Sequence, residues 1–174
     1  MVDIQIMPEI WKNAKKDIFR LEALPIYNVT EDFDLFRKWE KGKLNINLDF
    51  KKWLKNIKTT KSKGIRIRRV RVVQPRISDY LKYEIDVWKR TTKKGEEVYF
   101  IKSDDYTNLK KLFNFEFKDF WMFDNKVLLI FHYSKNGNFV KEELIIKEDI
   151  LAYYKKLKSN LLKQCLPMNK FIKK

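Results

Sequence analysis

The stretch that most constrains the fold is residues 65–101, because the spacing of its apolar side chains changes twice. Residues 65–73 are mainly β-branched residues and arginines, which predicts a strand. Residues 77–90 repeat apolar side chains at helical spacing, and after a turn at Gly95 the run EVYFI (97–101) predicts a second strand. A strand, a helix and a strand in succession form a β-α-β unit, which is typical of proteins that pack helices against a sheet.

The segments after this unit predict further strands. DFWMFD (119–124) is followed by a turn at Asn125 and by VLLIFHY (127–133), which is apolar on both faces and is therefore expected at the centre of a sheet. An Asn-Gly pair within residues 135–138 is a strong hairpin signal, and it leads into a return strand at 139–146. These strands predict a β-meander.

Helices are predicted on both sides of the strands. Trp11, Ala14, Ile18 and Leu21 recur at helical spacing, which predicts a first helix over residues 8–24 that ends before a proline. The same criterion predicts further helices over residues 31–41, 50–57, 106–113 and 150–165.

Together these elements predict an α/β (α+β) fold. It consists of a mixed sheet of about four to five strands, with N-terminal helices, a β-α-β unit, a β-meander or hairpin and a C-terminal helix. The chain has 174 residues, which suits one domain that can bury a sizeable core. We expect residues 1–174 to form a single domain, with a helical N-terminal part at 1–63 and a sheet-containing core at 64–174.

The charge of the chain is strongly positive, with 39 Lys and Arg against 23 Asp and Glu and a net charge of +16. The surplus is spread along the whole chain, so it is neither a basic arm nor a basic tail. Two interpretations remain open. One is attraction to phosphate or to acidic surfaces, and the other is a compositional bias toward lysine that serves no partner.

Several classes of protein and site are excluded or disfavoured. A single cysteine excludes an intramolecular disulfide and a cysteine-based zinc site. No apolar run approaches the length of a membrane span and the N-terminus lacks the plan of a signal peptide, so we expect no membrane association and a cytoplasmic location. Phosphate-binding loops and metalloprotease motifs do not occur, and we expect no cofactor and no metal. The sequence does not indicate an oligomeric state.

Half of the eight arginines lie within six positions of the first predicted strand: Arg66, Arg68, Arg69 and Arg71. Unlike lysine, arginine presents a planar fork that holds a carboxylate or a phosphate by two hydrogen bonds. These four residues are therefore the candidate anion-binding residues. The apolar residues of this strand do not alternate strictly, so we expect a β-bulge near Arg68 and Arg69 that places them all on one face.

Glu84 lies on the apolar stripe of the next helix, seven residues after Ile77. A carboxylate at such a position is costly to bury unless it is paired and hydrogen-bonded. Either Glu84 forms a structural pair with Arg69 or Arg71 that ties the helix to the sheet, or one or more arginines remain free to hold an anionic ligand.

Asp119 and Asp124 are the other candidate acidic residues. They flank the strand segment FWMF, and five positions along a strand direct two side chains to opposite faces, so a shared metal would need a bend between them. The alternative is that Asp124 and Asn125 form a turn, while Asp119 caps a segment or pairs with an arginine.

Nearly the whole chain carries short motifs that form a set: RLE (20–22), Pro25, Tyr27, Glu31, RVRVVQP (69–75), SDYLKYE (78–84), GEE (95–97), DFWMFD (119–124), Tyr133 and Gly137. The set resembles a family of small uncharacterised proteins that is common in actinomycetes and is described as a domain of unknown function. The resemblance implies kinship without an activity. It adds Tyr80 and Trp121 to the positions of interest, beside Arg69, Arg71, Glu84, Asp119 and Asp124.

A fainter likeness is to one half of a phospholipase-D-like domain. There too a strand–helix–strand unit with a glycine-led second strand precedes a strand that ends in aspartate. The catalytic HxK signature of that family is missing, because Tyr133 and Ser134 follow His132. The likeness therefore implies a degenerate and non-catalytic version.

Three functions follow as expectations. The charge and the arginines make a non-catalytic basic binding or regulatory module the leading hypothesis, with nucleic acid as the first anionic partner. The alternative is a protein-interaction or regulatory accessory subunit, which would expose an apolar patch. The third is a small enzyme in which Arg69 and Arg71 clamp an anion and Glu84, Asp119 or Asp124 acts as acid or base.

Overall fold

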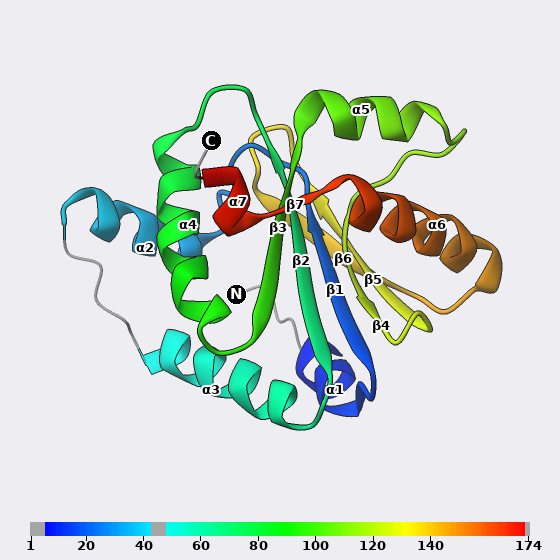
Figure 1. Ribbon diagram of the computed structural model, residues 1–174, viewed down its shortest axis with the longest axis horizontal. Coiled ribbons are helices and arrows are strands. Elements are labelled where there is room, and N and C mark those ends of the chain that lie inside the picture. The colour runs from blue at the N-terminus through cyan, green and yellow to red at the C-terminus, as the bar shows by residue number, and fades with distance from the viewer. Residues whose placement is uncertain (1–5, 43–47, 173–174) are drawn as a thin grey trace.

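The computed structural model describes residues 6–42 and 48–172 and arranges them around one mixed sheet (Figure 1). The strands of the described chain are β1 (Asp17–Glu22), β2 (Arg66–Val73), β3 (Glu96–Lys102), β4 (Asp119–Phe123), β5 (Val127–Tyr133), β6 (Phe139–Ile145) and β7 (Leu166–Pro167). Their spatial order is β6-β5-β4-β1-β2-β3-β7. The strands β1, β2 and β3 are parallel, whereas β4, β5 and β6 form an antiparallel meander beside β1, and β7 pairs antiparallel with β3. The predicted α/β class with a mixed sheet is confirmed.

Helices cover both faces of this sheet (Figure 1). The α6 face, which carries Phe19 and Val70, is covered by α5 (Ser103–Lys111) and α6 (Glu148–Gln164). The α4 face, which carries Ile18 and Ile67, is covered by α1 (Ile6–Asn13), α3 (Leu48–Ser62), α4 (Asp79–Thr92) and α7 (Met168–Ile172), and α2 (Thr30–Glu40) packs against α4. Within the described residues, no helix has the length and apolar composition that crossing a membrane requires.

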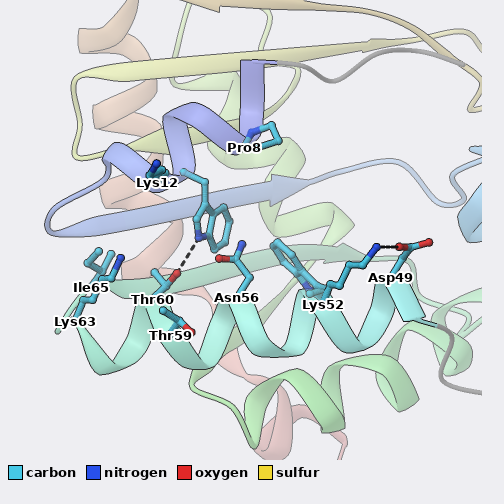
Figure 2. Close-up of a pocket in the computed structure, with 11 residues that line it drawn as sticks. Pro8, Lys12, Asp49, Lys52, Asn56, Thr59, Thr60, Lys63 and Ile65 are labelled. Carbon is cyan, nitrogen blue, oxygen red and sulfur yellow. Dashed lines mark hydrogen bonds and ion pairs between the residues drawn. The ribbon is translucent and has the colours of Figure 1, made fainter.

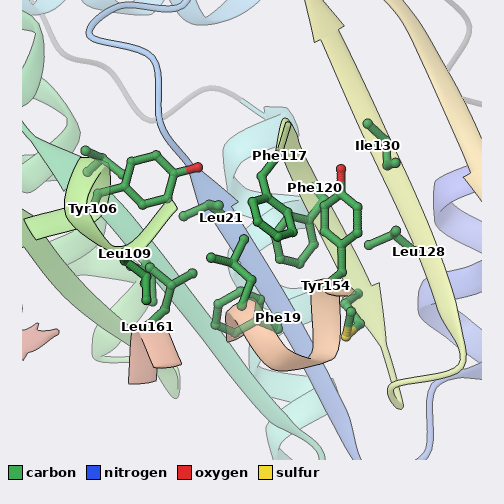
Figure 3. Close-up of a cluster of buried hydrophobic side chains, with 14 of the residues drawn as sticks. Phe19, Leu21, Tyr106, Leu109, Phe117, Phe120, Leu128, Ile130, Tyr154 and Leu161 are labelled. Carbon is green, nitrogen blue, oxygen red and sulfur yellow. The ribbon is translucent and has the colours of Figure 1, made fainter. Parts of the chain in front are cut away.

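The α6 face holds an apolar core (Figure 3). Phe19 and Leu21 of β1 and Phe120 of β4 are fully buried, and they meet Tyr154 and Leu161 of α6. The rings of Phe120 and Tyr154 lie edge to face with 4.8 Å between their centroids. Full burial of one large apolar side chain contributes about 1.5–3 kcal/mol, so this cluster makes a large contribution to the stability of the fold.

The α4 face is divided. Near one end, Ile18 and Ile67 pack under Trp11 of α1 and Ile57 of α3. Toward the β3 edge, a second apolar cluster lies between the sheet, α4 and α7, and includes Phe100. Charged side chains of β1 and β2 occupy the region between these clusters, and they form the site described below.

The β-α-β unit is held in place by local signals. Ser78 caps α4 by accepting a hydrogen bond from the backbone N–H of Leu81 at 3.1 Å. The turn after α4 requires glycine, because Gly95 has a φ of +113° and a Cβ there would lie 2.5 Å from Cγ of Lys61. Between these two ends the helix turns Glu84 into the protein, where it is buried.

Residues 17–22 form the central strand β1, so the prediction of one helix over residues 8–24 is wrong. The helix α1 ends at Asn13, and Ile18 and Leu21 point to opposite faces of the sheet. All six residues of β1 are buried, so neither face shows the polar alternation that marks a half-exposed strand. The part expected to be helical, 1–63, therefore supplies the centre of the sheet. With β1 and the two-residue β7, the sheet formed by the described residues has seven strands, more than the four to five that were expected.

The strand β2 is regular, so the prediction of a β-bulge near Arg68 and Arg69 is wrong. Its pairing with β1 and β3 shows no shift in register. Regular alternation sends Arg69 and Arg71 to the α4 face and Arg66 and Arg68 to the α6 face. The apolar residues fail to alternate because each face changes between apolar and charged along the strand, as from Ile67 to Arg69.

Candidate functional site

Charged side chains from four strands and one helix meet on the α4 face, and we call this group the charge network. Its members are Arg20 and Glu22 of β1, Arg69 and Arg71 of β2, Glu96 of β3, Asp119 of β4 and Glu84 of α4, none of them more than 9% exposed. The register explains how they meet. Arg20 lies beside Arg69 and Glu22 lies beside Arg71, so opposite charges face each other along the diagonals.

Arg69 links three strands. Its Nη1 donates to Oε1 of Glu22 at 2.5 Å, and its Nε donates to Oε1 of Glu96 at 2.9 Å. The guanidinium carbon also lies 5.8 Å from the ring centroid of Trp88 and 5.5 Å from that of Trp121. A lysine has a single nitrogen and no planar face, so it cannot make this set of contacts.

Arg71 ties α4 and the loop after β1 to the sheet. Its Nε and Nη2 both lie close to Oε2 of Glu84, at 3.0 and 2.9 Å. Its Nη1 donates to the carbonyl of Leu24, and its Nη2 donates to the carbonyl of Pro25 at 3.2 Å. This confirms the structural pair that was expected between Glu84 and either Arg69 or Arg71.

Asp119 holds the same loop from the other side. Its carboxylate accepts hydrogen bonds from the backbone N–H of Ala23 at 3.0 Å and from the hydroxyl of Tyr27. The loop then meets the turn between β5 and β6, where a Cβ on Gly137 would lie 2.6 Å from the carbonyl oxygen of Ile26. The charge network therefore holds residues 23–25 and Tyr27 as well as the sheet.

Arg20 lies between aromatic rings and is less completely paired. Its guanidinium carbon is 4.6 Å from the ring centroid of Phe131 and 5.3 Å from that of Trp121, and its Nε donates to Glu22 at 3.3 Å. Its Nη1 has no hydrogen-bond partner among the described residues, and the same holds for one oxygen each of Glu22 and Glu96. Unpaired buried polar atoms are costly, so these atoms mark the least satisfied part of the charge network.

Burial and neighbouring charges shift the pKa values of the carboxyl groups in the charge network, upward for some groups and downward for Glu22. Burial raises the pKa of Glu84 to about 8 and also raises the pKa of Asp119, because the attraction of the arginines compensates only in part. Burial opposes ionisation of Glu22 too, but the three arginines outweigh it and lower its pKa to about 2. Four carboxyl groups face three guanidinium groups, so a proton on Glu84 at neutral pH brings the group to charge balance.

The other two arginines of β2 make separate contacts on the α6 face. Arg68 pairs with Asp17, which also pairs with Lys158 of α6. Arg66 pairs with Glu97 at 3.1 Å, and its side chain is 55% exposed. Each of the four candidate anion-binding arginines thus holds a carboxylate, and Arg66 is the one whose side chain lies mainly in solvent.

Asp124 lies away from the charge network, at the turn between β4 and β5. Its carboxylate accepts hydrogen bonds from the three backbone N–H groups of residues 15–17, at 2.8, 2.7 and 2.9 Å. Burial acts to raise the pKa of Asp124, but the three backbone donors together outweigh burial and lower it. Positive φ values at Asp124 and Asn125 agree with the predicted turn. Among the residues that the structure describes, no three His, Cys, Asp or Glu side chains lie close enough to hold a metal.

A groove of about 620 Å³ lies between α1 and α3 (Figure 2). Lys52, Trp53, Asn56 and Lys63 line it from the α3 side, and Lys12 lines it from α1. Asn56 follows Lys52 by four positions and Trp53 by three, so these residues share one face of α3, and Lys63 lies just after the end of the helix. This basic groove is separate from the charge network.

The segment from α3 to the start of β2 is densely basic. Lys51, Lys52, Lys55, Lys58, Lys61 and Lys63 are all exposed, and Asp49 is the one acidic residue between positions 48 and 63. Some of these lysines border the basic groove, and Lys51, Lys55 and Lys58 do not.

The edge strand β6 carries exposed apolar side chains. Val140 is 60% exposed and Leu144 46%, and Ile146, just after the strand, is 69% exposed. Exposed apolar side chains are the feature expected of an accessory subunit. They do not identify a partner, so the protein-interaction alternative stays a prediction.

Comparison with known proteins identifies a family. Residues 6–173 match a domain of unknown function, DUF6879. The chain belongs to the DUF6879 family. No curated protein matches it. The expected kinship with a domain of unknown function is confirmed for nearly the whole chain, while the comparisons support neither the occurrence in actinomycetes nor the phospholipase-D-like likeness.

In this DUF6879 protein most of the motif positions of interest lie at the charge network, namely Arg69, Arg71, Glu84, Asp119 and Trp121. Trp121 lies beside Arg20 in the sheet, and the guanidinium carbons of Arg20 and Arg69 are both within 5.5 Å of its ring centroid, so it belongs with the charge network. Tyr80 does not, because it packs against Phe36 of α2 with 5.3 Å between the ring centroids. The motif set therefore marks both the charge network and the aromatic contact between α2 and α4.

Arg20, Glu22 and Glu96 belong to the charge network but were not predicted as site residues. Arg20 and Glu22 flank Leu21 in the pattern charged–apolar–charged, and Arg69 and Arg71 flank Val70 in the same pattern. Two such triplets inside otherwise apolar segments are the signal that could have found the pairing. It was overlooked because residues 17–22 were assigned to a helix.

Proposed function

We propose that this DUF6879 protein is a non-catalytic module that binds nucleic acid through the lysines of α3. The observation that carries the proposal is the exposure of six lysines between positions 51 and 63 beside a single acidic residue. A dense row of exposed cations attracts phosphate and releases the counterions of a nucleic acid, which makes binding favourable at low salt.

The pairing inside the protein supports this choice of surface. Three arginines of the charge network face four carboxyl groups, so the network adds nothing to the net charge of +16. The surplus therefore lies with side chains outside it. On the opposite face of the sheet, α6 has four lysines, but two of them are paired: Lys155 with Glu148 and the buried Lys158 with Asp17.

The environment of the acidic residues supports a non-catalytic function. A general acid or base must reach its substrate, but Glu84 is 7% exposed and is held by Arg71, and Asp119 is 4% exposed and is held by Tyr27. Asp124 lies elsewhere and is occupied by backbone N–H groups.

The experiment measures binding of labelled duplex and single-stranded DNA by fluorescence polarisation at two salt concentrations. If four phosphates are neutralised, raising salt from 50 to 200 mM should weaken binding about a hundredfold. The variant Lys51→Gln, Lys55→Gln, Lys58→Gln should bind more weakly, and the slope of log affinity against log salt should decrease by about 2.7 for duplex DNA.

The matched control removes three exposed lysines near α5 and α6: Lys111→Gln, Lys147→Gln, Lys163→Gln. Both triple variants have the same net charge, so a difference between them reports position and not total charge. The control should keep the affinity and the slope of the wild-type protein. Absence of binding at low salt, or equal loss in both variants, would contradict the proposal.

A further inference from the structure

The basic groove combines the size of a ligand site with an aromatic wall. Its volume of about 620 Å³ is within the range of pockets that hold small ligands, about 300–1,000 Å³. Trp53 is half-buried in its wall, and the ring centroids of Trp53 and Trp11 lie 4.9 Å apart at an angle of 64°. The indole of Trp53 is therefore supported from within the protein.

The base of the groove is fixed. Trp11 is 5% exposed, and its Nε1 donates to Oγ1 of Thr60 at 2.8 Å (Figure 2). Trp53 also lies 6.4 Å from Trp121, so a chain of aromatic rings leads from the groove into the core. A rigid aromatic side chain loses little entropy when a flat ligand stacks on it, which suits a binding surface.

The rim of the groove is cationic. Within the described chain Lys12 and Lys63 pair with no carboxylate, and Lys52 pairs with Asp49 at 2.9 Å in an exposed contact. Exposed pairs of this kind contribute little, so an anionic ligand can displace Asp49. Asn56 adds an exposed amide that offers both hydrogen-bond donors and an acceptor.

We propose that the basic groove binds a nucleotide unit of single-stranded nucleic acid, with a base stacked on Trp53 and phosphates held by Lys12, Lys52 and Lys63. The inference rests on the proposed function and adds that the bound nucleic acid is single-stranded and which residues contact it. A flat aromatic wall with a cationic rim fits an unpaired base and its phosphates. A duplex keeps its bases stacked inside, so it reaches the lysines and not the indole.

The test compares single-stranded and duplex DNA of one sequence with Trp53→Leu, Trp53→Phe and a control, Trp39→Leu. Trp39 is a half-buried tryptophan of α2 that hydrogen-bonds to Asp86 and does not line the groove. Trp53→Leu should weaken single-strand binding roughly five- to a hundredfold, because one stacked base is lost. Duplex binding should change less than twofold. Trp53→Phe should keep most of the affinity, and Trp39→Leu should keep all of it.

A second readout uses the wild-type protein, so it does not depend on the folding of a variant. A single strand that contains 5-bromouracil is bound, irradiated and mapped by mass spectrometry. The cross-link should fall on Trp53 or on a neighbouring residue of the basic groove. A cross-link confined to another surface would overturn the inference.

The outcomes separate this inference from the proposed function. If single strands and duplex bind with salt dependence but Trp53→Leu affects neither, or affects both equally, the groove is not the base-binding site and the α3 lysines alone carry binding. If neither form of DNA binds the wild-type protein at low salt, the proposed function fails, and this inference fails with it.

Discussion

The strand β2 and the helix α3 are both dense in positive charge, and the structure uses them in opposite ways. The arginines of β2 each hold a carboxylate, and Arg69 and Arg71 are almost completely buried. The lysines of α3 are exposed, and on the described chain Lys52 is the one that pairs with a carboxylate. Arginine therefore stands where forked and stacked contacts must be made inside the protein, and lysine stands where a solvated cation suffices. The buried arginines of β2 therefore hold neighbouring elements of the fold together.

The largest expected effect on stability is that of Arg71→Ala. The change removes the donor to the buried carboxyl group of Glu84, one of the cations that keep Glu22 ionised and two hydrogen bonds to the loop after β1, so the free energy of unfolding should fall by about 3–5 kcal/mol. Urea denaturation measures this. Arg66→Ala is the control from the same strand and should cost less than about 1 kcal/mol, because its pair is exposed. Equal costs for the two variants would refute the division of β2 into buried and exposed arginines.

A smaller effect is expected when arginine and lysine are exchanged in both regions. Arg69→Lys keeps the charge but loses the second carboxylate contact and the stacking on Trp88 and Trp121, so it should cost about 1–3 kcal/mol. Lys55→Arg in α3 should change the free energy of unfolding by less than about 0.5 kcal/mol. Thermal and urea denaturation of both variants measure these values. A neutral Arg69→Lys would show that the fork geometry is dispensable.

The smallest expected effect, counted per pH unit, is a dependence of the free energy of unfolding on pH of at most about 1.4 kcal/mol for each unit. The pKa of Glu84 is raised from its ordinary 4.5 to about 8, so between these values the unfolded chain releases a proton that the folded protein keeps. The free energy of unfolding should therefore fall as the pH rises from 5 to 8, with the contribution of Glu84 complete below pH 4.5 and lost above 8.

Urea denaturation across pH 5–8 tests this. Glu84→Gln should reduce the slope of the free energy of unfolding against pH. Glu97→Gln is the control, because the pKa of Glu97 is lowered by Arg66 and Tyr99 against the effect of burial, which places its contribution at acidic pH. An unchanged slope in Glu84→Gln would mean that Glu84 is ionised throughout this range.

Elements with strong local signals could be predicted from the sequence. The helix α4 begins at a serine cap and shows its apolar stripe, and the hairpin between β5 and β6 contains Asn-Gly. The strand β1 could not be recognised, because Ile18 and Leu21 continue the helical spacing of Trp11 and Ala14, and burial on both faces removes the period of two. The strand β7 has two residues, too few to show any period.

The contacts of the candidate site could be predicted from the sequence only where a single residue would be costly to bury unpaired. Glu84 on an apolar stripe required a cation nearby, and Arg71 supplies it. The pairing of Arg69 with Glu22 depends on the register between β1 and β2, so it could not be inferred while β1 was assigned to a helix. The basic groove depends on how α1 and α3 pack, which no local pattern specifies.

The central position of β1 has a consequence for synthesis on the ribosome. Asp17, at the start of β1, pairs through its backbone with Asp124, 107 positions later. At about 5–20 residues per second, the ribosome delivers β4 roughly 5–20 s after β1. During this interval β1, β2 and β3 can already associate, while the other edge of β1 has no neighbour. An unpaired edge is a template for other strands, so we expect this edge of β1 to be the place where the nascent chain is prone to mispair until its meander emerges.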